Sequence, residues 1–148
     1  MNYQHTQLGM AILVTLALIS LLIAIVFTVV GWHWISAIVL AILAIAAFLF
    51  HSLTVEITDN QLRLRFGPGV IHKTYPLGEI VRTEAVKNRW YYGWGIKLIP
   101  RGLLFNVSGL DAVEVTLESG KRVRIGTDRP QELEMAIRRS VGLEFPEI

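Results

Sequence analysis

The chain has 148 residues, a formal net charge of +2 and no cysteine, and 53% of its residues are hydrophobic. Without cysteine it can form no disulfide framework, thiol nucleophile or cysteine-based zinc site. The small net charge does not fit a nucleic-acid-binding domain, which concentrates basic residues on one surface. The four histidines show no metal-ligand spacing, so we expect no metal, no cofactor and no nucleic-acid partner.

The apolar residues are concentrated in the first third of the chain. The first residue among Asp, Glu, Lys and Arg is Glu56, and two apolar runs, residues 8–30 and 35–50, precede it. As a helix, the first run of about 23 residues spans about 34 Å, enough for a hydrocarbon layer of ~30 Å. The second is shorter, and we expect it to cross with the help of flanking residues. Residues 1–51 are thus predicted to form a two-helix transmembrane hairpin.

Two further features bear on this hairpin. A cleaved signal peptide is the alternative, but residues 1–7 contain no Lys or Arg, whereas a signal peptide begins with a basic segment. All 14 Lys and Arg residues follow the second run. The positive-inside rule therefore predicts a multi-pass protein of the cytoplasmic (inner) membrane with both termini in the cytoplasm.

Small side chains recur at helical spacing in both runs and allow close approach of two helices. We expect them to form the seam between the two helices, and the alternative is a seam between copies in a homo-oligomer. They are Ala17, Ser20, Ala24, Ala37, Ala41 and Ala44.

Residues 52–148 are predicted to form one mainly β domain. Apolar and polar residues alternate on both sides of Asp59-Asn60, so that a turn there pairs Thr58 with Gln61 and Ile57 with Leu62. Residues 70–77 and 80–86 indicate two more strands.

A second hairpin is predicted around a three-residue loop over residues 119–121, with Glu118 opposite Arg122. Its outer charged residues should pair with one another. Residues 128–141 then indicate a helix with Asp128 and Gln131 in capping-box spacing and an apolar stripe that includes Leu133 and Ile137.

About seven antiparallel strands capped by one C-terminal helix is the plan of a pleckstrin-homology-like domain. Four short motifs lead to the same architecture. They are YGWGI at residues 92–96, NVSG at 106–109, AVE at 112–114 and IGT-x-x-P at 125–130. In this order they resemble a family of small bacterial membrane proteins with a two-helix hairpin and a bacterial pleckstrin-homology-like domain. The resemblance implies architecture and supplies no catalytic residue or ligand.

The candidate interaction residues are an aromatic cluster and two arginines. Trp90, Tyr91, Tyr92 and Trp94 lie within five positions. They fit three interpretations: side chains partly packed in the core, an anchor at the membrane interface, or the wall of a groove for a peptide or lipid. Arg63 and Arg65 lie on one strand face and could attract anionic lipid, as could Arg82, Lys87, Arg89 and Lys97.

An enzyme is the competing class. A hydrolase would need Ser108 or Ser119 as nucleophile with His51 or His72 as base, and no spacing supports either pair. We therefore expect a non-catalytic, membrane-anchored interaction or scaffold module that binds a protein partner, the membrane surface, or both. A structural subunit of a membrane oligomer is the alternative, followed by a membrane enzyme.

Overall fold

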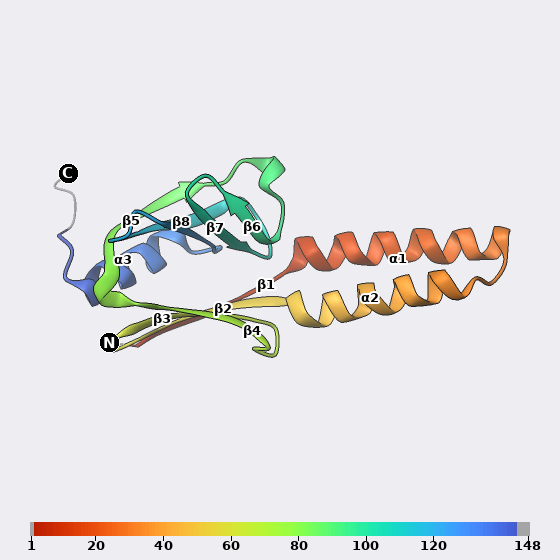
Figure 1. The fold of residues 1–148 in the computed structure, drawn as a ribbon, viewed down its shortest axis with the longest axis horizontal. Coiled ribbons are helices and arrows are strands. Elements are labelled where there is room, and N and C mark those ends of the chain that lie inside the picture. The colour runs from red at the N-terminus through yellow and green to blue at the C-terminus, as the bar shows by residue number, and fades with distance from the viewer. Residues whose placement is uncertain (1, 145–148) are drawn as a thin grey trace.

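The computed structural model of the chain describes residues 2–144. It consists of a pair of long antiparallel helices that projects from one end of a two-layered β domain (Figure 1). Helices α1 (Met10–Val30) and α2 (Trp34–Phe50) make up the hairpin. Helix α3 (Pro130–Val141) lies between the two sheets of the β domain (Figure 1).

The first sheet is antiparallel throughout and has the order β1-β2-β3-β4. The predicted register of its β2–β3 hairpin is confirmed, with Thr58 opposite Gln61 and Ile57 opposite Leu62. Its strands are Tyr3–Leu8, Ser52–Thr58, Gln61–Phe66 and Ile71–Pro76.

The second sheet has the order β5-β8-β9-β7-β6. The all-antiparallel prediction is wrong at one place, because β7 and β9 run parallel. After β7 the chain passes over one strand position to form β8 beside β5. The β8–β9 hairpin then places β9 between β8 and β7. Its strands are Ile80–Lys87, Gly95–Ile99, Gly102–Asn106, Asp111–Leu117 and Arg122–Gly126. Two 3-10 turns complete the domain, η1 (Leu77–Glu79) and η2 (Trp90–Tyr92).

Residues 3–8, which the sequence grouped with the hairpin, form a strand. Strand β1 lies before α1 and pairs with β2 from Tyr3 opposite Ile57 to Leu8 opposite Ser52. Its inward positions include His5 and Gln7, so the apolar alternation that identifies a strand in a sequence is missing. Backbone pairing with an edge strand forms this element regardless of side chain.

The predicted register of the second hairpin is wrong by two residues. Thr116, not Glu118, lies opposite Arg122, although Val115 still faces Val123 on the core side. The backbone N–H of Leu117 donates to Lys121 O (2.9 Å), which closes a longer loop. The outer charges do pair, since Glu114 accepts from Arg124 Nε at 2.7 Å.

Helix α3 begins at Pro130 rather than at 128, and the predicted capping box does not form. The Asp128 carboxylate instead pairs with His5 Nε2 of β1 at 2.6 Å. The Thr127 hydroxyl accepts a hydrogen bond from the Arg129 N–H (3.1 Å) in its place. The predicted apolar stripe is confirmed, because Leu133 and Ile137 are fully buried in the core between the sheets.

The half-buried side chains of the two hairpin helices are both large and small. Leu16 and Phe27 of α1 and Leu43 of α2 are half-buried, whereas Ala17, Ala24, Ala41 and Ala44 are exposed and only Ser20 and Ala37 are half-buried. The small-residue seam predicted from spacing is therefore wrong for four of its positions. Because α1 and α2 continue from the paired strands β1 and β2, we infer that the strand pair sets which helix faces meet.

Candidate interaction site at the base of the hairpin

The hairpin joins the β domain without a linker. One residue, Gly9, separates β1 from α1, and one residue, His51, separates α2 from β2. The Gly9 N–H donates to His51 O at 2.7 Å, so the hydrogen bonding of the β1–β2 ladder continues into the helix pair. A joint this short leaves few free dihedrals between the two parts, so it fixes how the domain stands on the hairpin.

Close backbone packing holds the same joint. Gly67, after β3, has a φ of +47°, and a Cβ on it would lie 2.7 Å from Leu49 O and 2.8 Å from Phe48 O at the end of α2. The Gly67 N–H donates to Ser52 O (2.9 Å). Only glycine fits such a position without displacing the helix end.

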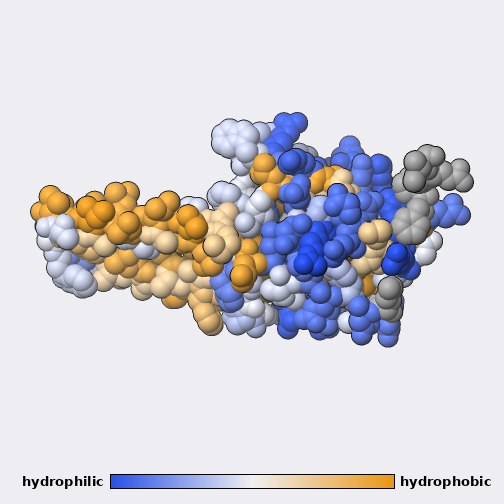
Figure 2. All heavy atoms as spheres, turned by 180° about the vertical axis from the view of Figure 1, so that it is seen from behind, coloured by the Kyte–Doolittle hydropathy of each residue, from blue (hydrophilic) through white to orange (hydrophobic). Residues whose placement is uncertain are grey.

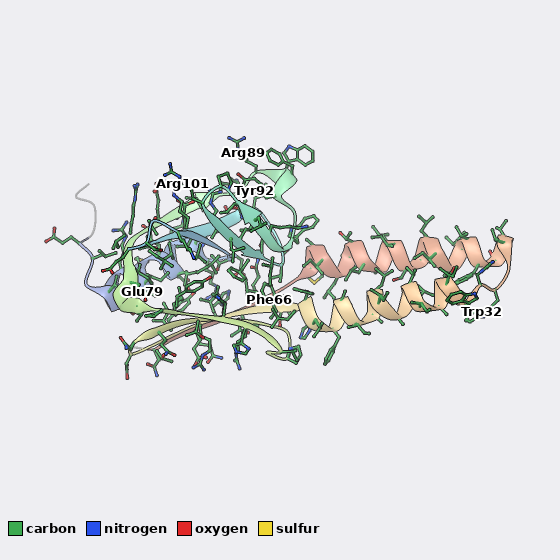
Figure 3. All side chains as sticks on the ribbon, in the orientation of Figure 1. Trp32, Phe66, Glu79, Arg89, Tyr92 and Arg101 are labelled. Atoms are coloured by element: carbon green, nitrogen blue, oxygen red, sulfur yellow. The ribbon has the colours of Figure 1, made fainter. Side chains whose placement is uncertain are left out.

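Aromatic rings extend the joint into the core. The Phe50 ring at the end of α2 meets the Phe66 ring edge-on at 5.2 Å, and Phe66 lies 6.1 Å from Phe105 of the second sheet. Figure 3 shows Phe66 at the end of the β domain from which the helices project. Helix α2 is thus packed against both sheets rather than only tethered to one.

Two residues of the aromatic cluster, Trp90 and Tyr91, are on the surface, whereas Tyr92 is half-buried. The Trp90 side chain is 80% exposed and Tyr91 is 55% exposed. The rings contact one another edge to face, Trp90 with Tyr91 at 5.9 Å and Tyr91 with Tyr92 at 5.2 Å. Arg89 donates to the Tyr91 hydroxyl at 2.6 Å, which raises the pKa of Arg89 and keeps it cationic.

A polar network holds this loop on the outer face of the second sheet. Arg124 of β9 bonds Glu114 of β8 at 2.7 Å and Asn88 Oδ1 at 3.3 Å, and its guanidinium carbon lies 5.9 Å from the centre of the Tyr92 ring. The Asn88 N–H donates to Leu110 O (2.7 Å). The loop is therefore presented from a fixed base. In Figure 3 Arg89 and Tyr92 lie on the side of the domain nearer the hairpin.

Trp94 differs from Trp90 because it lines a groove at the base of the helices. With Gly95 it forms one wall of a groove of about 250 Å³ whose other walls come from the base of the hairpin. The hairpin residues that line it are Ile12, Thr15, Leu16, Ala46 and Phe50. The predicted aromatic cluster thus divides in two, an exposed part around Trp90 and a part at the hairpin base around Trp94.

Arg63 and Arg65 are not brought to this site. Both are on β3 in the first sheet, and their register partners in the neighbouring strands are polar, Glu56 and Thr74 for Arg63 and Thr54 and His72 for Arg65. They belong to the polar outer face of the first sheet. The sequence placed aromatic and basic candidates in one set, whereas the structure separates them onto two sheets.

The β3–β4 turn is a second exposed element at the hairpin base that sequence reasoning did not single out. Its Gly67 contacts the end of α2, and its Val70 is 71% exposed. A signal was present, because an apolar residue directly after Gly67-Pro68-Gly69 is unusual in a polar turn. Exposed apolar side chains therefore lie at the hairpin base in both sheets.

The serines and histidines considered for catalysis are used in local backbone turns. His51 Nδ1 lies 2.7 Å from Phe48 O, and His72 Nδ1 lies 3.1 Å from Gly69 O. The backbone N–H of Ser108 donates to Asn106 Oδ1 (3.3 Å), and this hydrogen bond closes a turn. Within residues 2–144, no three His, Asp or Glu side chains are grouped closely enough to hold a metal ion.

A scan against protein-family models and searches of curated proteins and of solved structures found no match for this chain. The resemblance to bacterial two-span proteins with a pleckstrin-homology-like domain therefore stays a prediction. What the structure establishes is a β domain of two sheets joined to helices, of which α1 has the length and composition to cross a membrane.

Proposed function

We propose that the protein is a non-catalytic, membrane-anchored interaction module. The hairpin crosses the cytoplasmic membrane twice, and the β domain stands on its cytoplasmic face and meets a protein partner or the membrane surface through its aromatic loop, residues 89–94. Two sheets closed by a C-terminal helix support a pleckstrin-homology-like plan for this domain. The strand before the hairpin and the parallel β7–β9 pair are departures from that plan.

The observation that carries the proposal is the joint without a linker. Gly9 and His51 alone separate strands from helices, so the aromatic loop is held at a fixed height above the hairpin. Trp94 lines a groove whose other walls are the base of both helices. If the helices are in the bilayer, Trp94 stands at the headgroup level, where tryptophan is enriched.

The hairpin itself supports two crossings. The surfaces of α1 and α2 are almost wholly apolar in Figure 2, and neither helix contains a buried residue. Helix α2 has 17 residues and is about 25 Å long at 1.5 Å per residue, slightly short of the ~30 Å layer. Trp32 and Trp34 at its start are exposed and would complete the span within the interface. The turn between the helices has no Lys or Arg, and this bias in basic residues supports a β domain on the cytoplasmic side.

Site-specific photo-crosslinking in native membranes tests the proposal. A photoreactive amino acid at position 90 should form adducts with lipid or with a defined protein, because this side chain projects from the loop. Position 119, in the β8–β9 turn, is the matched control. The backbone N–H of Glu118 donates to Glu79 O there (2.8 Å), and Glu79 lies at the end of the domain away from the helices (Figure 3). Adducts at 119 but not at 90 would contradict the proposal.

A structural subunit of a membrane oligomer is the second candidate. It is favoured by the outward direction of Ala17, Ala24, Ala41 and Ala44, since small residues on an outer helix face allow another helix to approach closely. Ala24→Leu or Ala41→Leu should then lower the oligomeric state in detergent, measured by native mass spectrometry, while Leu22→Ala should not. A monomer for the unmodified chain would rule this candidate out.

A further inference from the structure

The groove beside Trp94 lies where the β domain meets the helices. It has a volume of about 250 Å³ and takes one wall from Trp94-Gly95 and the others from the first turns of α1 and the last turn of α2. Its helical walls are continuous with the outer apolar surface of the hairpin. An occupant can therefore enter from the medium that surrounds the helices.

The chemistry of the walls selects an apolar occupant. Every hairpin side chain that lines the groove is a hydrocarbon except Thr15, and the Thr15 hydroxyl already donates to Ala11 O at 2.8 Å. A polar ligand would lose its hydration without gaining partners along most of its length. The volume is also below the roughly 300 to 1,000 Å³ of pockets for drug-sized ligands. A slender hydrocarbon chain fits, whereas a helix about 10 to 12 Å across does not.

A cationic side chain, Lys97, lies near the groove without forming one of its walls. The position that a Cβ on Gly93 would take lies 3.8 Å from Lys97 Cε, so the Lys97 side chain passes beside the residue that precedes Trp94. In the described part of the chain Lys97 forms no ion pair. An apolar groove with a free ammonium group next to it matches a lipid that has a hydrocarbon chain and an anionic phosphate.

We propose that this groove binds one acyl chain of an anionic phospholipid from the surrounding bilayer, with its phosphate at Lys97. The inference rests on the proposed membrane insertion of the hairpin. It adds a defined lipid site to that function, in which the bound chain fills the space between Trp94 and the helices.

The test uses tryptophan fluorescence of the full chain in bilayers of phosphatidylglycerol with brominated acyl chains, because bromine quenches an indole that it contacts. The variant used in this test has Trp94 as its single tryptophan. We expect strong quenching that is largely lost in Ala46→Phe, which fills the groove. It should be unchanged in Ala44→Phe, which adds the same ring to an exposed position of α2. Leu16→Phe fills the groove from α1 and covers the case in which Ala46→Phe does not fold. The substitutions that leave Trp94 alone are Trp32→Phe, Trp34→Phe and Trp90→Phe.

Equal quenching in the filled and unfilled proteins would overturn the proposal. So would quenching that falls as the protein-to-lipid ratio rises, because a second copy of the chain would then occupy the groove. The phosphate contact predicts that Lys97→Gln removes a preference for phosphatidylglycerol over phosphatidylcholine, and an unchanged preference would refute that contact. A second protein with only Trp90 separates this test from the proposed function. If Trp90 of the exposed loop is not quenched by the brominated lipid, the docking of this loop on the membrane fails, whatever the result for Trp94.

Discussion

The hairpin and the β domain use similar hydrophobic side chains in opposite ways. In the hairpin no residue is buried, and Leu22 and Phe48 are more than half exposed. In the β domain Ile57, Leu62 and Leu133 are fully buried. A water-exposed hairpin of this kind would lose about 25 cal/mol for each Å² of apolar surface left uncovered. The β domain therefore buries its apolar side chains in its own core, whereas the described structure leaves those of the hairpin uncovered.

The largest expected effect tests where the β domain begins. A fragment of residues 52–148 lacks β1, which exposes one edge of β2 and removes the cover that Tyr3 provides to the core. We expect it not to fold, a loss of more than about 5 kcal/mol, the lower end of typical domain stabilities. A chain in which Asn-Gly joins Leu8 directly to Ser52 should fold without the hairpin, because these residues are paired and a two-residue turn can link them. Circular dichroism and urea melts compare the two, and equal stability would show that β1 is dispensable.

Charge substitutions in α3 should have the next largest effect. Leu133→Asp or Ile137→Asp would bury an unpaired carboxylate and is expected to unfold the domain, at a cost of several kcal/mol. Arg139→Asp is the control, because this side chain is exposed on the same helix. Thermal melts of the full chain in detergent measure all three. Similar melting temperatures would contradict the position of α3 between the sheets.

The joint between the two parts can be tested at Gly67. Gly67→Ala would combine a positive φ with a contact on Leu49 O, and we expect a loss of about 1 to 3 kcal/mol. Gly69→Ala has the same kind of backbone strain, but its nearest neighbour is a flexible side-chain atom, Arg65 Cδ at 3.6 Å. The difference between the two variants in a urea melt therefore isolates the close packing on α2. No difference would mean that the helix end moves freely.

The smallest expected effect is at the aromatic loop. Trp90→Ala should change stability by no more than about 0.5 kcal/mol, because the side chain is exposed. Val115→Ala removes two buried methyl groups from the core and should cost about 2 kcal/mol. A loss for Trp90→Ala as large as that for Val115→Ala, measured by chemical denaturation, would place the loop in the core and not at an interaction surface.

Local patterns in the sequence predicted the elements whose side chains carry the signal. Alternation fixed the β2–β3 register around Asp59-Asn60, and helical spacing fixed the buried stripe with Leu133 and Ile137. The aromatic residues Trp90 to Trp94 were identified as unusual from their density alone. In each case the signal comes from residues that are close together in the chain. Hydrophobic period and local composition are then sufficient to predict the element.

Long-range pairing was not accessible in this way. Strand β1 forms because its backbone completes the edge of β2, about 50 residues later in the chain. The parallel β7–β9 pair is a further example. So is the contact of Asp128 with His5, which takes the place of the predicted helix cap. Backbone hydrogen bonds do not depend on residue type, and a carboxylate bonds whichever donor the fold brings near.

The candidate site shows the same division. The sequence by itself determined that one third of the chain is uncharged and apolar, that the rest alternates as strands, and that four aromatic residues are grouped at one place. Only the tertiary structure decided that Trp94 shares a groove with both helices while Arg63 and Arg65 lie on the first sheet. The reason is geometric. Which side chains share a surface depends on strand order and on the linker-free joint at Gly9 and His51, and both arise from contacts between segments that are distant in the chain.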